Sequence, residues 1–326
     1  MEKRILRLLF IVTILVTIGF ISLSRSWAAE KYPSRPITLV CGYAVGGQAD
    51  LTNRLIARFL EKYLGGTVVP ESKPGAGGAI AATFVANSRP DGYTILSSGD
   101  AFGINFLLGQ ANYKIEDFRI FAEVFVVDAV LAVSTDSPWK TFQEFIDYAK
   151  KNPGVRYAHP GIGSTPWLAM EDLNKDANLK LVGVPFKGDA ESVPAVVAKH
   201  VPIGIHGAFA AKTQADAGKM RILLSLEPSA EVGLDPAIPD FNSVYGKKAG
   251  VDISTYILVP AKTPNDIVQV LERAAEKMTK DPEYILELKR AFYKPGFLDG
   301  NTLMQKKFPE KMARIKMLLK EAGMVK

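Results

Sequence analysis

The sequence predicts an α/β protein of two lobes with a ligand cleft between them. Three observations support this fold class: strand-like and helix-like stretches alternate from Pro36 onward, the alternation restarts after the run FAEVFVVDAVLAVS, and three helix-like stretches end the chain. Such alternation is typical of mostly parallel sheets covered by helices. If the chain returns to the first unit near residue 250, the helical tail completes the first lobe. The expected bounds are 29–130 plus 250–326 for the first lobe and 131–249 for the second.

The first lobe begins with the strand-like run ITLVCGY, followed by a helix expected from Gln48 to Leu64 with apolar residues on one face. Gly65 and Gly66 then favour a helix end. The strand TVVPE, the small-residue helix AIAATFVAN and the strand YTILSS complete this part, separated by the turns KPGAGG and RPDG.

The second lobe begins with Thr141 and Glu144, whose spacing predicts a capping box at the start of TFQEFIDYAKK. Strands are expected at VRYAH, KLVGVPF, VPIGI and MRILLSL, with helices after GSTP and from about Asp189. The Pro-, Gly- and Asp-rich stretch EPSAEVGLDPAIPDFNSVYGKKAG predicts a loop. The strand ISTYILVP follows, and then helices that start at Pro264 after the cap Thr263, at Pro282 after the cap Asp281, and at Asn301.

The first thirty residues have the pattern of an export signal. Lys3, Arg4 and Arg7 precede an apolar stretch over 8–23, and small residues stand at Ser26 and Ala28. This pattern predicts a secretory signal peptide, residues 1–28, cleaved before Ala29. The competing interpretation is an uncleaved anchor, but the stretch is shorter than the roughly 20 residues that a membrane-spanning helix needs.

The charge of the chain gives little support to nucleic-acid binding. Residues 1–28 hold four basic residues and one acidic residue, and so carry half of the net charge of +6. The rest shows no stripe of Lys and Arg with interleaved aromatic residues, which nucleic-acid binding would favour. A mild positive balance fits a small anionic ligand. The lone Cys41 cannot form an internal disulfide and is expected to be a packed thiol.

Three glycine-rich turns stand where a strand gives way to a helix: YAVGGQAD, KPGAGG and HPGIGSTP. Ligands of parallel α/β sheets bind beyond the carboxyl ends of the strands, where helix starts offer unpaired N–H groups and a partial positive charge. Glycine lets a ligand atom approach those amides. Because neither G-x-G-x-x-G nor G-K-[ST] occurs in these turns, a carboxylate is favoured over a phosphate.

Several polar residues of these turns have both a functional and a structural interpretation. Thr165 before Pro166 is expected to cap the next helix, which leaves Ser164 and the Gly163 amide for a ligand. The alternative is that both hydroxyls only cap. Asp50 either caps its own helix, the favoured interpretation, or accepts a donor from the ligand. Ser98, at the end of a strand, either faces the ligand or is an ordinary turn residue.

No catalytic, cofactor or metal site is predicted. The three histidines, His159, His200 and His206, form no H-E-x-x-H pattern, and C-x-x-C and G-x-S-x-G are absent as well. The protein is therefore expected not to be an enzyme. A secreted α/β hydrolase that uses Ser164 or Ser98 is the alternative from another class.

Taken together, the motifs resemble those of one family. YPSRPI, YAVGGQAD, KPGAGG, PDGYTIL, HPGIGSTP, PFKG and LVPAKTPNDIV occur in this order, from Tyr32 to the C-terminal helices. The chain thereby resembles the extracytoplasmic substrate-binding proteins of tripartite tricarboxylate transporters, the Bug receptors. The resemblance implies a periplasmic-binding-protein-like (Venus flytrap) fold whose first lobe is completed by the C-terminal part. It also implies a small organic carboxylate, held partly through backbone amides and water by the loops matching YAVGGQAD and HPGIGSTP.

The resemblance further implies a periplasmic protein that delivers its ligand to integral membrane transporter subunits, and we expect a monomer. A ligand-sensing receptor for a membrane signalling partner is the alternative. The expected ligand-binding residues are Tyr43, Val45, Gly46, Gly47, Gln48, Asp50, Gly78, Ser98, His159, Gly161, Gly163, Ser164, Thr165, Lys187 and His206.

Some of these residues depart from the usual family pattern. Val45 stands where proline is usual, and Gln48 replaces a small residue, so that it would add a side-chain donor. His159 also replaces a small residue, and Phe186 replaces the Tyr of a PYKG motif. His206 replaces an acid, which predicts a ligand with an additional negative or aromatic group. The competing interpretation of His206 is a solvated surface residue.

Overall fold

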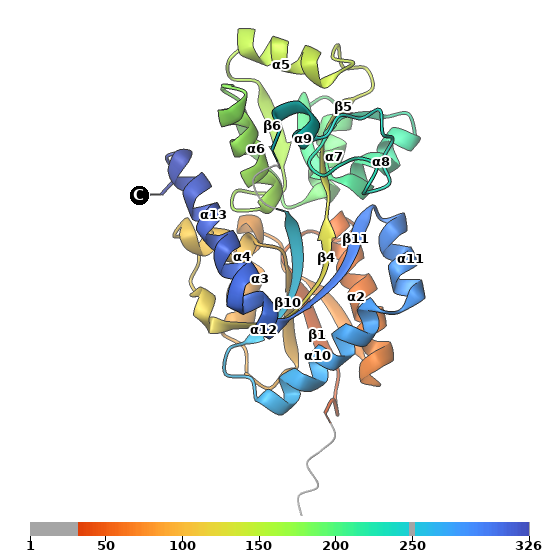
Figure 1. The fold of residues 1–326 in the computed structure, drawn as a ribbon, viewed down its shortest axis with the longest axis vertical. Coiled ribbons are helices and arrows are strands. Elements are labelled where there is room, and N and C mark those ends of the chain that lie inside the picture. Colours follow the sequence, from red (N-terminus) through yellow and green to blue (C-terminus); the bar gives the residue numbers. More distant parts are fainter. Residues whose placement is uncertain (1–31, 248–251, 326) are drawn as a thin grey trace, which may run out of the picture. The chain divides into compact units, whose positions relative to one another are not determined.

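The computed structural model describes residues 32–247 and 252–325. The expected signal peptide lies outside these residues. From Arg35 on, the described chain forms one unit, which contains a six-stranded and a five-stranded sheet. We call the six-stranded sheet with its helices the first lobe and the five-stranded sheet with its helices the second lobe (Figure 1).

The first sheet has the strand order β11-β4-β10-β3-β1-β2. Its strands are β1 (Ile37–Cys41), β2 (Val68–Ser72), β3 (Thr94–Ser98), β4 (Phe118–Val127), β10 (Ile253–Pro260) and β11 (Tyr293–Asp299). β1 pairs in parallel with β2 and β3, whereas β10 and β11 pair antiparallel with their neighbours. The expectation of a mostly parallel sheet is therefore wrong for this lobe, because the strands contributed by the C-terminal part run against the others.

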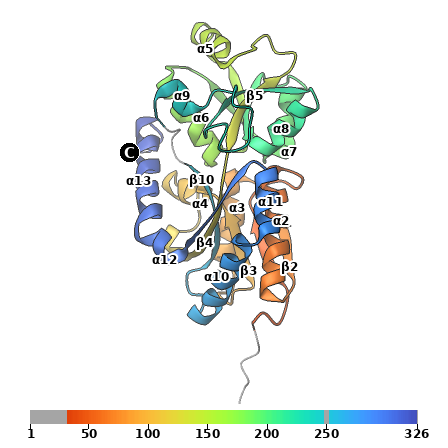
Figure 2. The same cartoon turned by 45° about the vertical axis from the view of Figure 1, so that its right-hand side comes forward.

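Helices cover both faces of the first sheet. They are α2 (Gln48–Leu64), α3 (Ala79–Ala86), α4 (Ala101–Leu107), α10 (Asn265–Thr279), α11 (Pro282–Arg290), α12 (Gly300–Thr302) and α13 (Phe308–Glu321), with short turns of helix at η1 (Ala76–Gly78), η2 (Ile115–Asp117) and η3 (Leu303–Lys307). Helix α10 packs against α2 and α11, while α4 packs against α3 and α13 (Figure 2).

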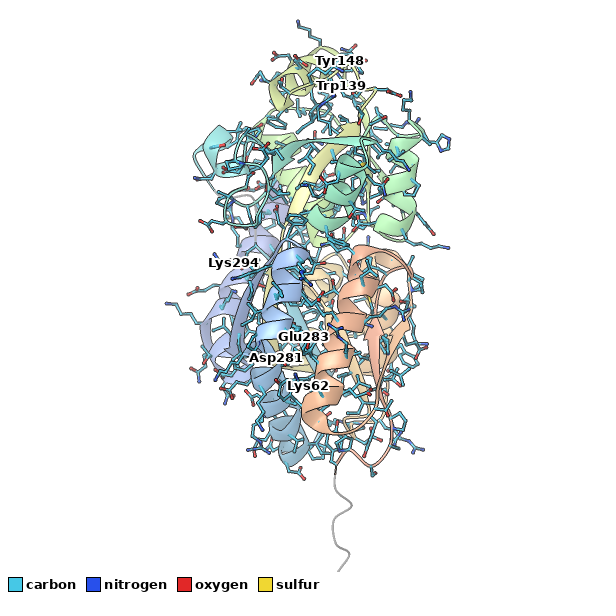
Figure 3. The ribbon with its side chains drawn as sticks, turned by 90° about the vertical axis from the view of Figure 1, so that its right-hand side faces the viewer. Lys62, Trp139, Tyr148, Asp281, Glu283 and Lys294 are labelled. Carbon is cyan, nitrogen blue, oxygen red and sulfur yellow. The ribbon has the colours of Figure 1, made fainter. Side chains whose placement is uncertain are left out.

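The sequence predicts the cap residues of two C-terminal helices, and one of these two predictions is confirmed. Asp281 caps α11 as predicted, since its carboxylate accepts the Glu283 amide at 2.8 Å. Lys62 of α2 also binds this carboxylate, at 2.6 Å (Figure 3). The prediction that Thr263 caps α10 is wrong. Pro264 occupies the cap position, and the Thr263 hydroxyl donates backward to the Pro260 carbonyl at 2.7 Å.

The second sheet has the order β7-β6-β8-β5-β9. Its strands are β5 (Ala129–Ser134), β6 (Arg156–His159), β7 (Val182–Pro185), β8 (Ile203–Gly207) and β9 (Met220–Ser225), and its helices are α5 (Phe142–Lys151), α6 (Thr165–Asp176), α7 (Asp189–Val197), α8 (Ala208–Asp216) and α9 (Phe241–Tyr245). β6 pairs in parallel with β7 and β8, and β5 pairs antiparallel with β8 and β9. Four of the five strands of this sheet therefore run in one direction and β5 runs against them, so the expectation of a mostly parallel sheet holds here.

The chain crosses between the two sheets at Asp128, where β4 ends and β5 begins. After β9 it passes through a stretch that contains α9, a helix not expected from the sequence, and enters the first sheet again as β10. The return near residue 250 thus has a structural counterpart in β10. The lobe bounds derived from the sequence stay a prediction.

Helix α13 packs on both hydrophobic cores. Phe308 at its start lies in the cluster of Phe102, Tyr256 and Leu303 in the first lobe. Ile315, Leu318 and Leu319 lie in the main cluster of the second lobe, with α5 and α6. The last helix therefore joins the two lobes by apolar packing.

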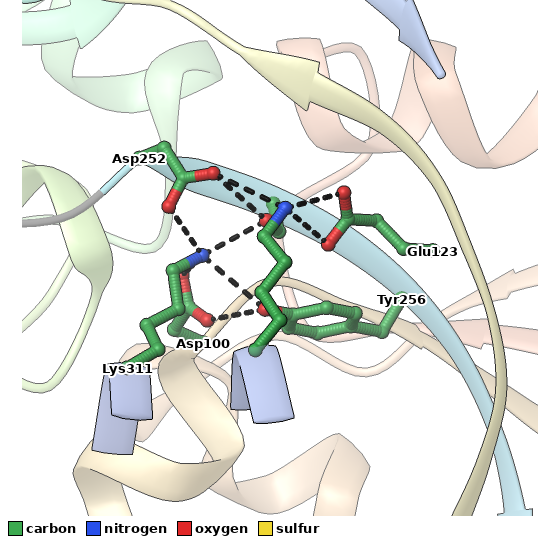
Figure 4. A network of polar contacts seen from close by, with 7 residues as sticks. Asp100, Glu123, Asp252, Tyr256 and Lys311 are labelled. Carbon is green, nitrogen blue, oxygen red and sulfur yellow. Dashed lines mark hydrogen bonds and ion pairs between the residues drawn. The ribbon is translucent and has the colours of Figure 1, made fainter. Parts of the chain in front are cut away.

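A buried polar network lies where α13 passes the start of β10 (Figure 4). Lys311 of α13 binds Asp100 and Asp252, each at 3.0 Å, and the Ser254 hydroxyl at 2.8 Å. The Tyr256 hydroxyl donates to Asp100 at 2.9 Å. Such a network stabilises the fold only when its members are paired, and here it connects α13, α4 and β10.

Candidate ligand-binding site

A cavity of about 120 Å³ is lined by residues of both lobes. The first lobe contributes the loop after β1, the start of α2, the end of β3 and the start of β10. The second contributes the start of α6, the start of α7 and the end of β8. Its polar lining residues are Tyr43, Gln48, Thr52, Ser97, Ser98, Asp128, Thr165, Asp189 and Thr255. The cavity thus lies in the predicted cleft, at the strand ends where helices begin.

Asp50 forms hydrogen bonds within its own lobe that hold the loop YAVGGQAD. The Asp50 carboxylate accepts the Gly46 amide and the Arg54 guanidinium, each at 3.0 Å, and the Ser72 hydroxyl at 3.1 Å. Burial alone would raise the pKa of Asp50, but the hydrogen bonds from Gly46 and Arg54 outweigh it and lower the pKa below its usual value. The favoured interpretation, that Asp50 caps its own helix, is wrong, because Gly47 stands at the cap position of α2. Asp50 still has a structural role, since it binds the loop before that helix.

Gln48 is the residue of this loop that reaches farthest across the cavity. It is buried, and its side-chain oxygen lies 3.5 Å from the Ala210 amide of the second lobe. A Cβ atom at Gly207 would lie only 1.7 Å from that oxygen, so glycine is required there for the close approach. Gln48 and Ala49 are the first residues of α2, and their amides have no acceptor inside the helix.

The two hydroxyls before α6 exchange the roles that the sequence predicts. Ser164, not Thr165, is the N-cap: its hydroxyl accepts the Trp167 amide at 3.4 Å and donates to the Gly161 carbonyl at 2.7 Å. The helix begins at Thr165, one residue earlier than the sequence predicts, so the hydroxyl that stands three residues before Trp167 takes the capping role. Thr165 is the hydroxyl that lines the cavity.

Gly161 and Gly163 contact the first lobe and do not line the cavity. A Cβ atom at Gly163 would lie 2.3 Å from Asn105 Oδ1, and one at Gly161 would lie 3.0 Å from Gly77. Gly77 in turn approaches the Ile162 carbonyl, which a Cβ atom would meet at 2.1 Å. Three glycines of KPGAGG and HPGIGSTP thus lie where the two lobes approach closely, and we call them the glycine seam: Gly77, Gly161 and Gly163. Gly77 and Gly161 meet backbone, and Gly163 meets the Asn105 side chain.

His159 is buried outside the cavity. Its Nδ1 accepts the Gly161 amide at 3.2 Å, and its exposed fraction is 1%. Burial lowers the pKa of His159 to about 4. The neutral ring of His159 accepts a hydrogen bond from the Gly161 amide and so holds the loop before α6. Any effect of His159 on a ligand is therefore indirect.

His206 is fully buried, which excludes the interpretation as a solvated surface residue. It is not a lining residue of the cavity either. Its Nδ1 lies 3.1 Å from the Ser192 hydroxyl and 3.5 Å from Asp189 Oδ1. The resemblance implies an acid at position 206. In this chain the position is His206, and the acid Asp189 lies beside it.

The remaining predicted residues divide into two groups. Tyr43, Gly47 and Ser98 line the cavity. Val45 is 63% exposed, Gly46 and Lys187 are exposed, and Gly78 packs under Tyr43 and Gly42. Lys187 contributes its carbonyl, which accepts the Ala44 amide at 3.0 Å and so joins the two lobes.

Several lining residues were not predicted. Thr52 bonds the Tyr293 hydroxyl at 2.8 Å, and Asp189 begins α7 with one carboxylate oxygen 3.4 Å from the Gly207 amide. Asp128 accepts the Ser225 hydroxyl at 2.7 Å and the Glu227 amide at 3.1 Å. Burial raises the pKa of Asp128 to about 7. The sequence feature that could have identified Asp189 as a lining residue is its position at a helix start directly after PFKG.

The described residues give no support for catalysis or for a metal centre. Residues 32–247 and 252–325 contain no cluster of three His, Cys, Asp or Glu that could hold a metal ion. The Ser164 hydroxyl is occupied by Gly161 and Trp167, and no hydrogen bond joins it to a histidine in the described part of the chain. Within that part, none of the helices is both long and apolar enough to cross a membrane.

Comparisons with known sequences place this arrangement in one family. A family model described as the tripartite tricarboxylate transporter family receptor matches residues 52–324. A UPF0065 protein of Bordetella pertussis is 32% identical over 277 residues, which cover 83% of this chain and 84% of the relative. A UPF0065 protein from the gbd 5′ region of Cupriavidus necator is 31% identical over 315 residues, which cover 95% and 94%.

Solved structures agree with the sequence comparisons. The periplasmic binding protein BugD aligns with a TM-score of 0.83 at 27% identity, over 90% of this chain and 99% of BugD. A Rhodopseudomonas palustris protein with adipate aligns with a TM-score of 0.82 at 26% identity, over 90% and 98%. MatC of the same organism, with bound malate, aligns with a TM-score of 0.79 at 25% identity, over 88% and 100%. The predicted two-lobed periplasmic-binding-protein fold is confirmed, and the chain belongs to the tripartite tricarboxylate transporter receptor family of periplasmic solute-binding proteins.

Proposed function

We propose that the protein captures a small organic carboxylate in the cavity between its lobes and delivers it to integral membrane subunits of a transporter. The observation that carries this proposal is the cavity itself, which both lobes line and to which the starts of α2, α6 and α7 contribute. The unpaired amides at a helix start and its partial positive charge favour an anion. The adipate and malate bound by two similar proteins support a carboxylate.

Ligand capture in this proposal depends on closure of the lobes. The Ala44 amide bonds the Lys187 carbonyl at 3.0 Å, and the side chain of Gln48 packs on Gly207, so both contacts cross from one lobe to the other. A ligand that contacts both lobes binds the closed state more tightly than the open state and shifts the equilibrium toward closure. In this proposal the mature chain starts at Ala29, is exported to the periplasm, and acts as a monomer without enzymatic activity.

The first test is thermal unfolding of residues 29–326 with a panel of organic carboxylates and their amide analogues. A ligand at a hundred times its dissociation constant stabilises the folded state by about 2.7 kcal/mol, which raises the unfolding midpoint by several degrees. We expect a shift with at least one acid and none with its amide. Equal shifts with acid and amide would contradict a carboxylate site.

Two neighbouring variants then separate binding from folding. Thr165→Val removes the hydroxyl that lines the cavity and is expected to reduce the ligand-induced shift while leaving the midpoint without ligand nearly unchanged. Ser164→Ala removes the N-cap of α6 and is expected to lower the midpoint without ligand, by a loss of about 1 kcal/mol of unfolding free energy. If Ser164→Ala abolishes binding and Thr165→Val does not, the assignment of the cavity wall is wrong.

A further inference from the structure

The charged side chains that line the cavity are all acidic. Among the described lining residues these are Asp128 and Asp189, and no Lys, Arg or His lines it with them. A ligand whose charges were all negative would meet acids and no cation. We propose that the ligand carries an ammonium group that binds Asp189, so that it is an amino carboxylate rather than a simple organic acid. This inference rests on the proposed function and names the ligand class of the same site.

Asp128 does not offer an equivalent site. Both of its carboxylate oxygens already accept hydrogen bonds, one from the Ser225 hydroxyl and one from the Glu227 amide. It is 1% exposed, and burial raises its pKa to about 7, so its charge near neutral pH is only partial. Asp128 therefore connects the crossing between the lobes to the loop after β9. Its carboxylate oxygens are engaged in these hydrogen bonds and are less available to a ligand.

Asp189 is different because one of its oxygens lacks a donor. Oδ2 lies 3.4 Å from the Gly207 amide, at the limit of a hydrogen bond. Oδ1 is buried and accepts no hydrogen bond from the described residues. The side chain as a whole is 12% exposed. A buried carboxylate whose hydrogen bonds are incomplete is costly. Because Asp189 lines the cavity, its carboxylate group is the one to which a ligand donor is expected to bind.

Among the described residues, no lysine or arginine forms an ion pair with Asp189. Tyr43 and Tyr293 lie near enough for the Asp189 charge to add to the effect of burial on their pKa, and both pKa values are raised. Their hydroxyls are engaged elsewhere, with the Gly77 carbonyl and with Thr52. His206 Nδ1 lies 3.5 Å from Oδ1, but His206 Nε2 is buried without a partner. The ring atom nearest to Asp189 also lies 3.1 Å from the Ser192 hydroxyl, a shorter contact than the one to Asp189.

The carboxylate of the ligand is expected to bind at a different helix start from its ammonium group. Helix α7 already has a carboxylate at its start, that of Asp189 itself, and this acid interacts favourably with the helix dipole. The first turn of α6 contains no acid, and the one in the first turn of α2 is Asp50, which binds Gly46, Arg54 and Ser72. The ligand carboxylate is thus left to the amides at the start of α2 and to Thr165, and its ammonium group to Asp189.

The test uses calorimetric titration of residues 29–326, refolded to remove any bound ligand, with sets of compounds that share one carbon skeleton. Three such sets are L-aspartate, L-malate and succinate; L-leucine, 2-hydroxy-4-methylpentanoate and 4-methylpentanoate; and L-phenylalanine, phenyllactate and 3-phenylpropanoate. A hydrogen bond to a charged group is worth roughly tenfold or more in affinity. We expect an amino acid to bind at least tenfold more tightly than its hydroxy and deaminated counterparts.

Two variants locate the effect. Asp189→Asn is expected to reduce the preference for the amino compound to less than about threefold, because a neutral amide loses the charge-assisted bond. Asp216→Asn, on α8, is the matched control and should leave the preference unchanged, since the Asp216 side chain is 64% exposed and pairs with Lys212 at the surface.

Each outcome decides one of the two proposals. A deaminated or hydroxy acid that binds the wild-type protein as tightly as its amino counterpart overturns the assignment of an ammonium group, while the carboxylate function stands. This comparison within the wild-type protein does not depend on the folding of a variant. An unchanged amino preference in Asp189→Asn also overturns the role of Asp189. If no carboxylate of any set binds and those of the thermal panel fail as well, the proposed function itself is wrong.

Discussion

His159 is a buried side chain whose protonation state is coupled to the stability of the second lobe. Its Nδ1 accepts the Gly161 amide at 3.2 Å, and a Cβ atom at Gly183 would lie 2.9 Å from its Nε2. Since burial lowers the pKa of His159 from 6.5 to about 4, the folded state favours the neutral ring. The contribution to the unfolding free energy is complete above pH 6.5 and is lost as the pH falls toward 4.

We expect His159→Gln to reduce the acid sensitivity of the protein between pH 6.5 and 4. Over this range the wild-type protein should lose roughly 3 kcal/mol of unfolding free energy through His159, whereas glutamine can accept the Gly161 amide and does not titrate. Urea denaturation at pH 7, 6, 5 and 4 measures the difference. His200→Gln, at an exposed position, is the control, and parallel pH curves for wild type and His159→Gln would contradict the assignment.

At the scale of single residues, the sequence predicted the right loops but not which atoms face the cavity. Gln48, Ser98 and Thr165 line it, and their contact with a ligand stays a prediction. His159 and His206 do not, because both rings point into the packed interior of the second lobe, a fact of tertiary packing that no local pattern contains. The sequence favours Thr165 as the cap because Pro166 follows it, but the Trp167 amide donates to Ser164 instead. Asp189 resembled any acid in the first turn of a helix.

At the scale of elements, α13 holds a special place because its two ends belong to different cores. Phe308 packs in the first lobe, and Leu318 and Leu319 pack in the second. Lys175 of α6 adds an ion pair with Glu321 at 2.6 Å, but surface pairs of this kind contribute little. The apolar contacts therefore dominate the attachment of the helix to the second lobe.

Leu319→Ala should lower the unfolding free energy by about 2 to 5 kcal/mol, the cost of removing a fully buried leucine side chain from a packed core. Met317→Ala, two residues earlier on the same helix, changes a side chain that is 41% exposed and should cost less than about 0.5 kcal/mol. Urea denaturation of both variants gives the comparison. Similar losses for the two would show that the end of α13 is not anchored as described.

Elements with strong periodicity were predicted well, and those with mixed signals were not. The expected helix from Gln48 to Leu64 has these bounds in the structure, and Asp281 caps α11 as predicted. Strand β11 has the sequence YKPGFLD, in which Pro and Gly argue against a strand, yet pairing with β4 at the sheet edge forms it. The run FAEVFVVDAVLAVS gives no expectation of two separate strands, but Asp128 divides it into β4 and β5 of different sheets.

At the scale of the whole molecule, the two lobes approach each other closely along the glycine seam. Gly163 has a φ of +85°, and a side chain there would strike the Asn105 side chain of the first lobe. The seam therefore depends on the absence of a side chain at each of its glycines. Closure that depends on such a contact can be blocked by a single methyl group without changing the cavity wall.

Gly163→Ala is accordingly expected to weaken binding of the ligand identified in the thermal panel by at least about tenfold, because the closed state becomes less populated. Gly154→Ala is the matched control, since Gly154 has a φ of +91° and nothing lies within 4 Å of its added Cβ atom. Both variants should lose about 1 to 3 kcal/mol of unfolding free energy through backbone strain. Equal ligand affinity in the two variants, measured by calorimetry, would exclude the seam as a determinant of closure.

The polar network around Lys311 links the cavity wall to helix α13. Asp100 directly follows Gly99, and Asp252 directly precedes Ile253, and both Gly99 and Ile253 line the cavity. The lysine of α13 holds both acids at 3.0 Å, so a shift of either lining segment moves a charge to which the last helix is bound. Met317 lies on the exposed side of that helix. An environment-sensitive fluorophore attached there would turn the receptor into an optical sensor of its own ligand, with the dye outside the cavity.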